Sequence, residues 1–296
     1  MSVEIGDSAP DFSLPCDGDG GDLTIPMNAE FDHLADAAVA ALTAPEPSDK
    51  VNLTHAMARD WRSGAIAEIG FASPPRRPAR PPLPELREPR DMPRRGKGGT
   101  NAGRIALLHA IAHIELNAID LACDIIARFG GTDLPRAFYD DWVTVADEEA
   151  KHFGLLCNRL AAYDASYGDL PAHDGLWKAA EQTAGDILAR LAVVPLILEA
   201  RGLDVTPAMI VNLQNARDAD SAGVLEIIYR DEIGHVEIGI RWFEHVCRSR
   251  GLAPITTYHD LVRKHFRGKL KPPFNAEARR RAGFGPEYYE PLVAPE

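Results

Sequence analysis

The chain has 296 residues, 45% of them hydrophobic, which is enough for one large core with extensions. Its net charge of −12 disfavours a general affinity for nucleic acid or anionic membranes, and no apolar run suggests a membrane span. Four cysteines in a chain this long do not make a disulfide framework, and the acidic N-terminus lacks the apolar core of a secretory signal. We therefore expect a cytoplasmic protein with no membrane association.

Residues 1–99 are the first predicted region and are expected to pack on the main helical body. The Gly-, Asp- and Pro-rich segment 1–25 predicts irregular structure. Helices are expected over 28–43 and 52–63, because apolar residues recur there at three- and four-residue spacing. The tract 74–93 then carries eight prolines and several arginines, which excludes a helix or a central strand. An extended arm lying over the helices is the favoured interpretation, and an exposed partner-binding arm is the alternative.

Residues 100–250 predict a bundle of long helices, and 251–296 a C-terminal extension. The expected helices span 101–129, 135–163, 173–201, 207–216 and 220–248. Pro195 lies inside the third and must kink it or free a carbonyl, and Gly202 is expected to end it. No segment has the alternation of a strand, so the predicted fold class is all-α.

Three Glu-x-x-His motifs place a carboxylate and an imidazole one turn apart on a helix face, where both can bind one metal ion. Motifs this short also arise by chance, so their surroundings must distinguish them. Glu149–His152 and Glu232–His235 each lie in the middle of a long apolar helix, where unpaired charge is costly. The third motif, which ends at His33, is typical of a solvated helix face.

A lone glutamate precedes each central motif at nearly the same distance. Glu115 lies 34 residues before Glu149, and Glu199 lies 33 before Glu232. In an antiparallel hairpin the 14 residues up to Phe129 rise by about 21 Å and the next helix descends by as much, which brings the two glutamates to one height. This repeated arrangement is typical of dimetal carboxylate bundles. The predicted metal ligands are Glu115, Glu149, His152, Glu199, Glu232 and His235. Such a set suits two iron ions, with manganese or a mixed pair as alternatives.

Three further side chains are candidates for supporting roles. Glu148 precedes His152 by four residues and Asp231 precedes His235 by four, so each is placed to accept the second N–H of that imidazole. Tyr229 lies one turn before the second motif and is a candidate to hydrogen-bond into the site or donate an electron. A packed core tyrosine is the commoner meaning of that position.

The bundle sequence also resembles known proteins, through the segments HAIAHIELNAIDLACD, VADEEAKHFGLL, VPLILEARGLDVTP and IIYRDEIGHVEIGIRWF. Over about residues 30–285 the chain is similar to an uncharacterised bacterial family of the ferritin-like superfamily. The string IYRDEIGH also resembles bacterial multicomponent monooxygenases and ribonucleotide reductase small subunits. The resemblance implies a ferritin-like four-helix core and a di-iron carboxylate site, but no substrate.

The leading functional hypothesis is an O2-dependent oxidase or hydroxylase of unknown substrate. A ferroxidase or other iron-handling protein is the second hypothesis. A tRNA-modifying hydroxylase is the third, because a more distant relative in the superfamily hydroxylates a modified tRNA adenosine and basic residues cluster within 76–97 and 263–281. The expected partners are a small-molecule substrate and an external electron donor. Nucleic acid is less favoured, and a homodimer is left open.

Overall fold

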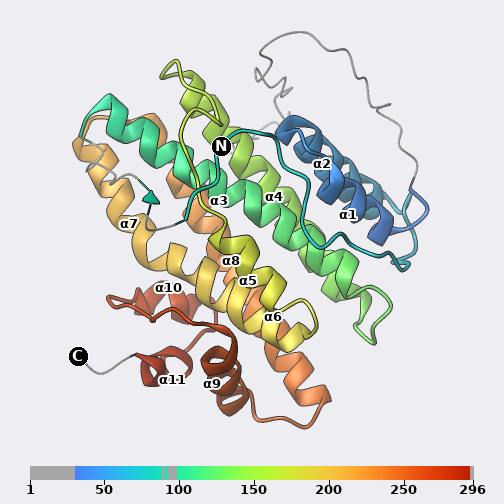
Figure 1. The fold of residues 1–296 in the computed structure, drawn as a ribbon. Helices are drawn as coiled ribbons and strands as arrows, with labels where there is room; N and C mark the ends of the chain where they lie inside the picture. The colour runs from blue at the N-terminus through green and yellow to red at the C-terminus, as the bar shows by residue number, and fades with distance from the viewer. Residues whose placement is uncertain (1–30, 89–90, 93–98, 294–296) are drawn as a thin grey trace, which may run out of the picture.

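The computed structural model describes residues 31–88, 91–92 and 99–293, and the regular secondary structure of this part of the chain is helical (Figure 1). The helices are α1 Leu34–Thr43, α2 Pro47–Ser63, α3 Asn101–Arg128, α4 Arg136–Ala161, α5 Gly175–Gln182, α6 Ile187–Val193, the π-helix η2 Val194–Glu199, α7 Ala200–Asn215, α8 Ala219–Ser249, α9 Pro254–His265, α10 Ala276–Arg281, α11 Pro286–Tyr289 and the 3-10 helix η3 Glu290–Leu292. Isolated β-bridges occur, but no strand forms within the described ranges. The predicted all-α class is confirmed. The irregular structure expected over 1–25, and the first residues of the helix expected from 28, lie outside the described residues.

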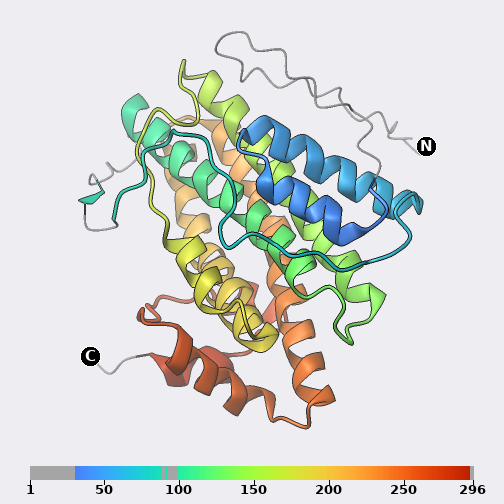
Figure 2. The same ribbon diagram turned by 45° about the vertical axis from the view of Figure 1, so that its right-hand side comes forward.

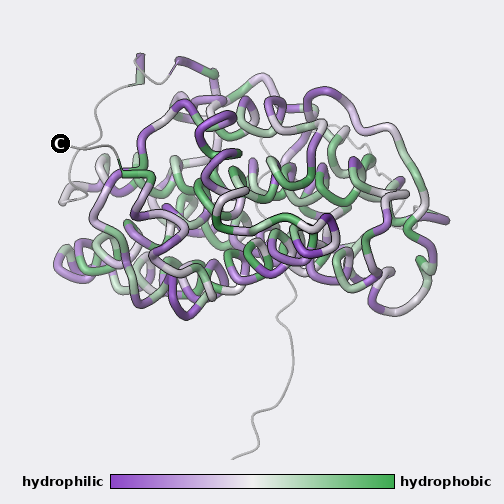
Figure 3. The backbone as a smooth tube through the Cα atoms, turned by 90° about the horizontal axis from the view of Figure 1, so that it is seen from below, coloured by the Kyte–Doolittle hydropathy of each residue, from purple (hydrophilic) through white to green (hydrophobic). Residues whose placement is uncertain are grey.

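Four long helical runs make up the body that holds the candidate site: α3, α4, the continuous run α6–η2–α7, and α8. Helix α3 packs along α4, and α8 packs against α4, η2 and α7. Local signals set the ends of these runs, since the Thr100 hydroxyl accepts a hydrogen bond from Gly103 N at 3.1 Å and the Asp218 carboxylate accepts one from Ser221 N at 3.2 Å. Gly131, with φ of 75°, follows α3 in the left-handed conformation that glycine favours. Along the helices, hydrophobic and hydrophilic residues recur within each turn, as in amphipathic helices (Figure 3).

The N-terminal helices and the proline-rich segment lie against this body. Helix α1 packs on α3 and α2 packs on α4, and the segment after α2 crosses the same side as an extended tube (Figure 2). Arginines attach that segment to the bundle: Arg80 pairs with the buried Asp120 at 2.6 Å, and Arg77 pairs with Glu181 at 3.1 Å. Lys50 of α2 reaches the same Asp120 at 2.7 Å, with both side chains fully buried. The described part of the arm is therefore fixed by ion pairs to helices that the bundle itself positions.

The third predicted helix differs most from expectation. It is interrupted after α5 and restarts at α6, and the helix expected to end at Gly202 instead continues to Asn215. Glycine costs only about 1 kcal/mol inside a helix, and packing against α8 outweighs that cost. Pro207, also inside α7, has no N–H to donate to the Leu203 carbonyl, which instead accepts a hydrogen bond from Asn275 Nδ2 at 3.1 Å. Pro195 does perturb the helix as predicted, in the form of the π-helical turn η2.

The C-terminal helices α9–α11 pack on α6, α7 and α8 through buried aromatic residues. Arg279 lies among three of these rings and donates to the carboxylate of Asp204 on α7 at 2.7 and 2.9 Å. It also donates to the Ala200 carbonyl at 3.2 Å, close to the π-helical turn. This arginine belongs to a basic run considered for RNA contact, but it is buried and paired inside the protein.

Helix α3 is long and apolar enough to cross a membrane by length and composition, which the sequence reading did not anticipate. However, 72% of its most apolar stretch is buried inside the protein, as expected for a core helix. No other helix in the described ranges meets that test.

Candidate metal centre

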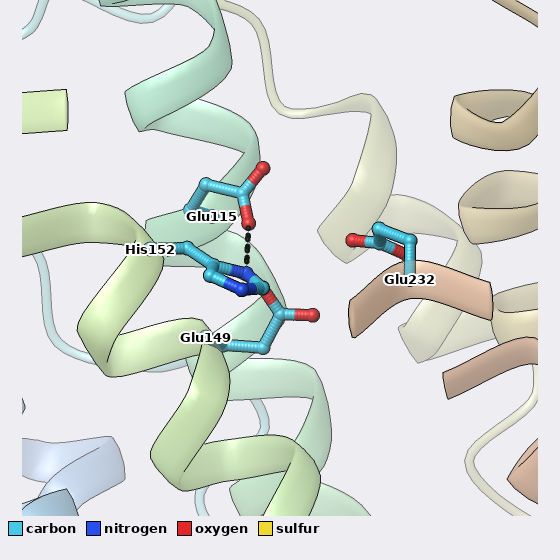
Figure 4. Close-up of side chains that lie close together, drawn as sticks. All are labelled: Glu115, Glu149, His152 and Glu232. Atoms are coloured by element: carbon cyan, nitrogen blue, oxygen red, sulfur yellow. Dashed lines mark hydrogen bonds and ion pairs between the residues drawn. The ribbon is translucent and has the colours of Figure 1, made fainter. Parts of the chain in front are cut away.

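A cluster of buried glutamates and histidines lies between α3, α4 and α8. Glu115, Glu149, His152 and Glu232 each offer a ligand atom, and these atoms all lie within 4.8 Å of one another. Figure 4 shows Glu115, Glu149 and His152 close together, with Glu232 facing them from α8. Three helices thus direct buried acidic side chains toward one point. A buried cluster of this composition could bind a metal ion.

Glu149 occupies the middle of the cluster, between two imidazoles. Its Oε2 lies 3.4 Å from His152 Nδ1, and its Oε1 lies 3.0 Å from His235 Nδ1. Glu115 Oε2 approaches His152 Nδ1 at 3.3 Å, and Glu232 Oε2 lies 3.8 Å from His235 Nδ1. The ring centroids of the two histidines are 5.9 Å apart. Each imidazole therefore points its Nδ1 atom into the cluster and toward one oxygen of the same carboxylate.

The outward-facing nitrogen of each histidine is bound by a carboxylate from the opposite helix. His235 Nε2, from α8, donates to Glu148 Oε2 on α4 at 2.8 Å. His152 Nε2, from α4, donates to Asp231 Oδ2 on α8 at 3.2 Å. Each carboxylate therefore holds the imidazole of the other helix, and not, as predicted, the one a turn along its own helix. The packing of α4 on α8 brings the partner histidine into reach instead.

Glu199, the last residue of η2, lies at the side of the cluster. It lines one cavity together with Glu115 and Glu232, and its Oε2 atom is buried without a hydrogen-bond partner. The π-helical turn places it there, since α6 and α7 continue on either side of that turn. The structure thus brings all six predicted ligands to one region, and their metal-binding role stays a prediction.

Burial dominates the acid–base behaviour of three of the carboxylates. Burial and the neighbouring charge of Glu149 raise the pKa of Glu115 to about 8 and that of Glu199 to about 7. The same causes raise the pKa of Glu232 well above its ordinary value. The raised pKa values mean that nearby positive charge does not offset the cost of burying these three carboxylates in their charged form.

Glu149 and the two histidines behave in the opposite way. Burial tends to raise the pKa of Glu149, but hydrogen bonds with His152 and His235 outweigh it and hold that pKa well below its usual range. Burial tends to lower the pKa of each imidazole, but contacts with carboxylates raise both well above the ordinary value. The charges of the Glu149 carboxylate and the two imidazoles thus compensate one another, whereas the charges of the other three carboxylates are not compensated.

The donor set itself fits divalent iron or manganese. Oxygen and imidazole ligands without a thiolate suit these ions, whereas structural zinc is held in closed tetrahedral sites that usually contain thiolates. Two carboxylate oxygens facing the cluster, Glu199 Oε2 and Glu232 Oε2, are buried and lack a hydrogen-bond partner. Unpaired donors and acceptors are costly in a protein interior, and a bound cation would satisfy them.

Two further side chains near the site are Tyr229, which was predicted to support it, and Lys151, which was not. The Tyr229 hydroxyl accepts a hydrogen bond from Asn275 Nδ2 at 2.9 Å on the C-terminal segment, so it supports packing there rather than pointing at the cluster. Lys151, which the sequence reading missed, donates to Asp231 Oδ2 at 2.6 Å and fixes the carboxylate that holds His152. Its position between Glu149 and His152 could have indicated that it lies near the cluster.

Comparison with known proteins identifies the family. Residues 43–290 match a family described as protein of unknown function (DUF455). The chain is also 44% identical over 209 residues to an uncharacterized protein of Haemophilus influenzae, covering 69% of this chain and 72% of that protein. No solved structure matches it. The expected kinship with an uncharacterised family is confirmed, and the chain belongs to the DUF455 family of proteins of unknown function.

Proposed function

We propose that the chain is a ferritin-like dimetal carboxylate protein that oxidises a small molecule with O2. The observation that carries the proposal is the central Glu149 carboxylate, which turns one oxygen toward each of two inward-facing imidazoles. Two Glu-x-x-His motifs and two further glutamates on facing helices are the ligand set of ferritin-like dimetal proteins. The four helical runs and their buried cluster support the same assignment.

The ligands divide naturally into two halves. Glu115 and His152 would hold one ion, and Glu199, Glu232 and His235 would hold the other, with Glu149 between them. Iron in both positions is the preferred assignment, and manganese or a mixed pair fits the same donors. When bound, such ions would supply the redox chemistry by which O2 is used.

The surrounding side chains hold this arrangement in place. Glu148 and Asp231 fix the Nε2 side of each imidazole, so the Nδ1 atoms stay directed into the cluster. The external electron donor expected for such a protein would dock on the face formed by α2 and α4, close to the cluster. There a cleft of about 480 Å³ is lined by Glu148, which holds His235, and by Lys151, which pairs with the carboxylate that holds His152.

Two observations favour oxidation of a small molecule over the alternatives. The cavity that reaches Glu115, Glu199 and Glu232 is mainly aliphatic, which is a poor route for a hydrated ferrous ion and weighs against a ferroxidase or iron-handling role. Among the described arginines of the arm, Arg77 and Arg80 are engaged with acidic residues of the bundle, which weighs against RNA binding there.

Metal analysis tests the proposal. Protein purified without added metal, or loaded anaerobically with ferrous ion, should contain about two equivalents of iron or manganese. Glu149→Gln should lose most of that metal, whereas Glu237→Gln, an exposed carboxylate on α8, should retain it. Metal binding that is absent, or equal in both variants, would contradict the proposal. O2 uptake by the loaded protein with a reductant, absent in Glu149→Gln, would then test the oxidase assignment.

A further inference from the structure

An apolar cavity opens on the candidate metal centre at Glu115, Glu199 and Glu232. It has a volume of about 160 Å³ and lies between α3, α7 and α8, with two residues from η2 and one from α5. Glu115, Glu199 and Glu232 form its polar end. Its aliphatic lining includes Ile111, Ala118, Leu121, Leu198, Leu225 and Ile228.

Gly202 forms part of the wall of this cavity on α7. A Cβ atom built at Gly202 would meet no other atom within 4 Å, so neighbouring atoms do not force a glycine there. Glycine in the interior of a helix costs about 1 kcal/mol relative to alanine. The residue therefore leaves space at the cavity wall at some cost to the helix. Gly239 on α8 differs, because a Cβ there would lie 2.5 Å from Pro195 Cβ.

The cavity reaches the surface between α3 and α7. Ile114 lines it and is 43% exposed, which is unusual for a large aliphatic side chain. Val205 and Met209 lie on the α7 side of the cavity and are partly buried. A ligand entering there would meet aliphatic side chains before it reached the carboxylates.

The lining of the cavity selects against charged ligands, because its mainly aliphatic side chains cannot replace the hydration of a charge. Its polar end carries carboxylates, which disfavour an anion. Arg201 is the cationic residue among those lining it, and its guanidinium donates to the Lys271 carbonyl at 2.8 Å and pairs with Asp204 at 3.4 Å. The space itself matches the roughly 150 Å³ at which an apolar protein cavity stays dry and binds benzene.

We propose that this cavity binds a compact, uncharged hydrocarbon group of about the size of a benzene ring, and that this group is the part of the substrate presented to Glu115, Glu199 and Glu232. The proposal rests on the proposed oxidase function for its role, but not for the binding itself. The substrate class is therefore a small apolar molecule, aliphatic or aromatic, that enters beside Ile114.

Ligand binding can be measured without turnover. Benzene is the probe and benzoate its charged counterpart, tested by thermal unfolding and calorimetry on the full chain. Benzene should raise the unfolding midpoint by binding the folded state, and benzoate should not. Gly202→Leu places a side chain in the cavity and should abolish the benzene shift. Gly223→Leu, at a helical glycine of α8 that also has open space around it, should keep the shift.

The result that overturns the proposal is a missing benzene shift in the wild type, an equal response to benzoate, or an unchanged shift in Gly202→Leu. If Gly202→Leu does not fold, Ile114→Trp at the exposed mouth replaces it and should slow or abolish benzene binding. Metal content measured on the same preparations separates the two hypotheses. Benzene binding without metal would refute the dimetal function alone, and metal without benzene binding would refute the substrate class alone.

Discussion

Replacing Gly239 with alanine should loosen the π-helical turn from α8 and weaken the candidate metal centre. The added Cβ would lie 2.5 Å from Pro195 Cβ and 2.7 Å from Pro195 Cγ, far inside the roughly 3.5–4 Å at which carbon atoms pack. The proline ring cannot rotate away, so η2 must shift by on the order of 1 Å. Overpacking of this kind costs about 1–3 kcal/mol, and the gain in helix propensity returns about 1 kcal/mol.

The matched control is Gly223→Ala on the same helix, where the new Cβ meets nothing within 4 Å. That variant should be more stable than the wild type by about 0.5–1 kcal/mol, so the two variants should differ by about 1–3 kcal/mol in denaturant unfolding. Because Glu199 ends η2 and metal sites tolerate displacements of only about 0.5 Å, Gly239→Ala should also bind metal more weakly in a chelator competition. Equal stabilities with unchanged metal affinity would refute the reasoning.

Two further predictions concern buried charges. Glu148→Ala removes the acceptor of His235 Nε2 and should weaken metal affinity about 10- to 100-fold, whereas Glu148→Gln, which retains an acceptor oxygen, should lose less; equal affinities in all three proteins would contradict a positioning role. Lys50→Met leaves its buried carboxylate partner with one arginine and should lower the free energy of unfolding by about 3 kcal/mol, while Lys178→Met, in an exposed pair, should change it much less. A loss in Lys50→Met no larger than in Lys178→Met would show that the buried pair adds little.

The parts of the fold set by local chemistry were predictable. The helix expected over 101–129 is Asn101–Arg128, and the helix expected over 220–248 is Ala219–Ser249, because apolar periodicity and capping residues act within a few positions of the chain. The site region followed from the same periodicity, since Glu–Glu-x-x-His repeats on antiparallel helices meet at one height.

The remainder depends on contacts between distant segments. Helix α7 continues through Gly202 and Pro207 because α8 and Asn275 stabilise it, and neither contact can be read from the local sequence. The exchange of partners between Glu148 and Asp231 likewise follows from how α4 lies against α8. Sequence spacing finds which side chains share a helix face, but not which neighbouring helix supplies their partners.

The π-helical turn Val194–Glu199 has a consequence for how this site can change. Such a turn is equivalent to inserting one residue into an otherwise continuous helix, so the faces of α6 and α7 are offset by about 100°. Deleting one residue there would restore α-helical register only by rotating one half of the run against the other. Glu199 and the Gly202 wall would then no longer both face α3 while α6 kept its packing on α8 and α9. The position of Glu199 and the shape of the apolar cavity therefore depend on a single register shift, and a change in one would disturb the other.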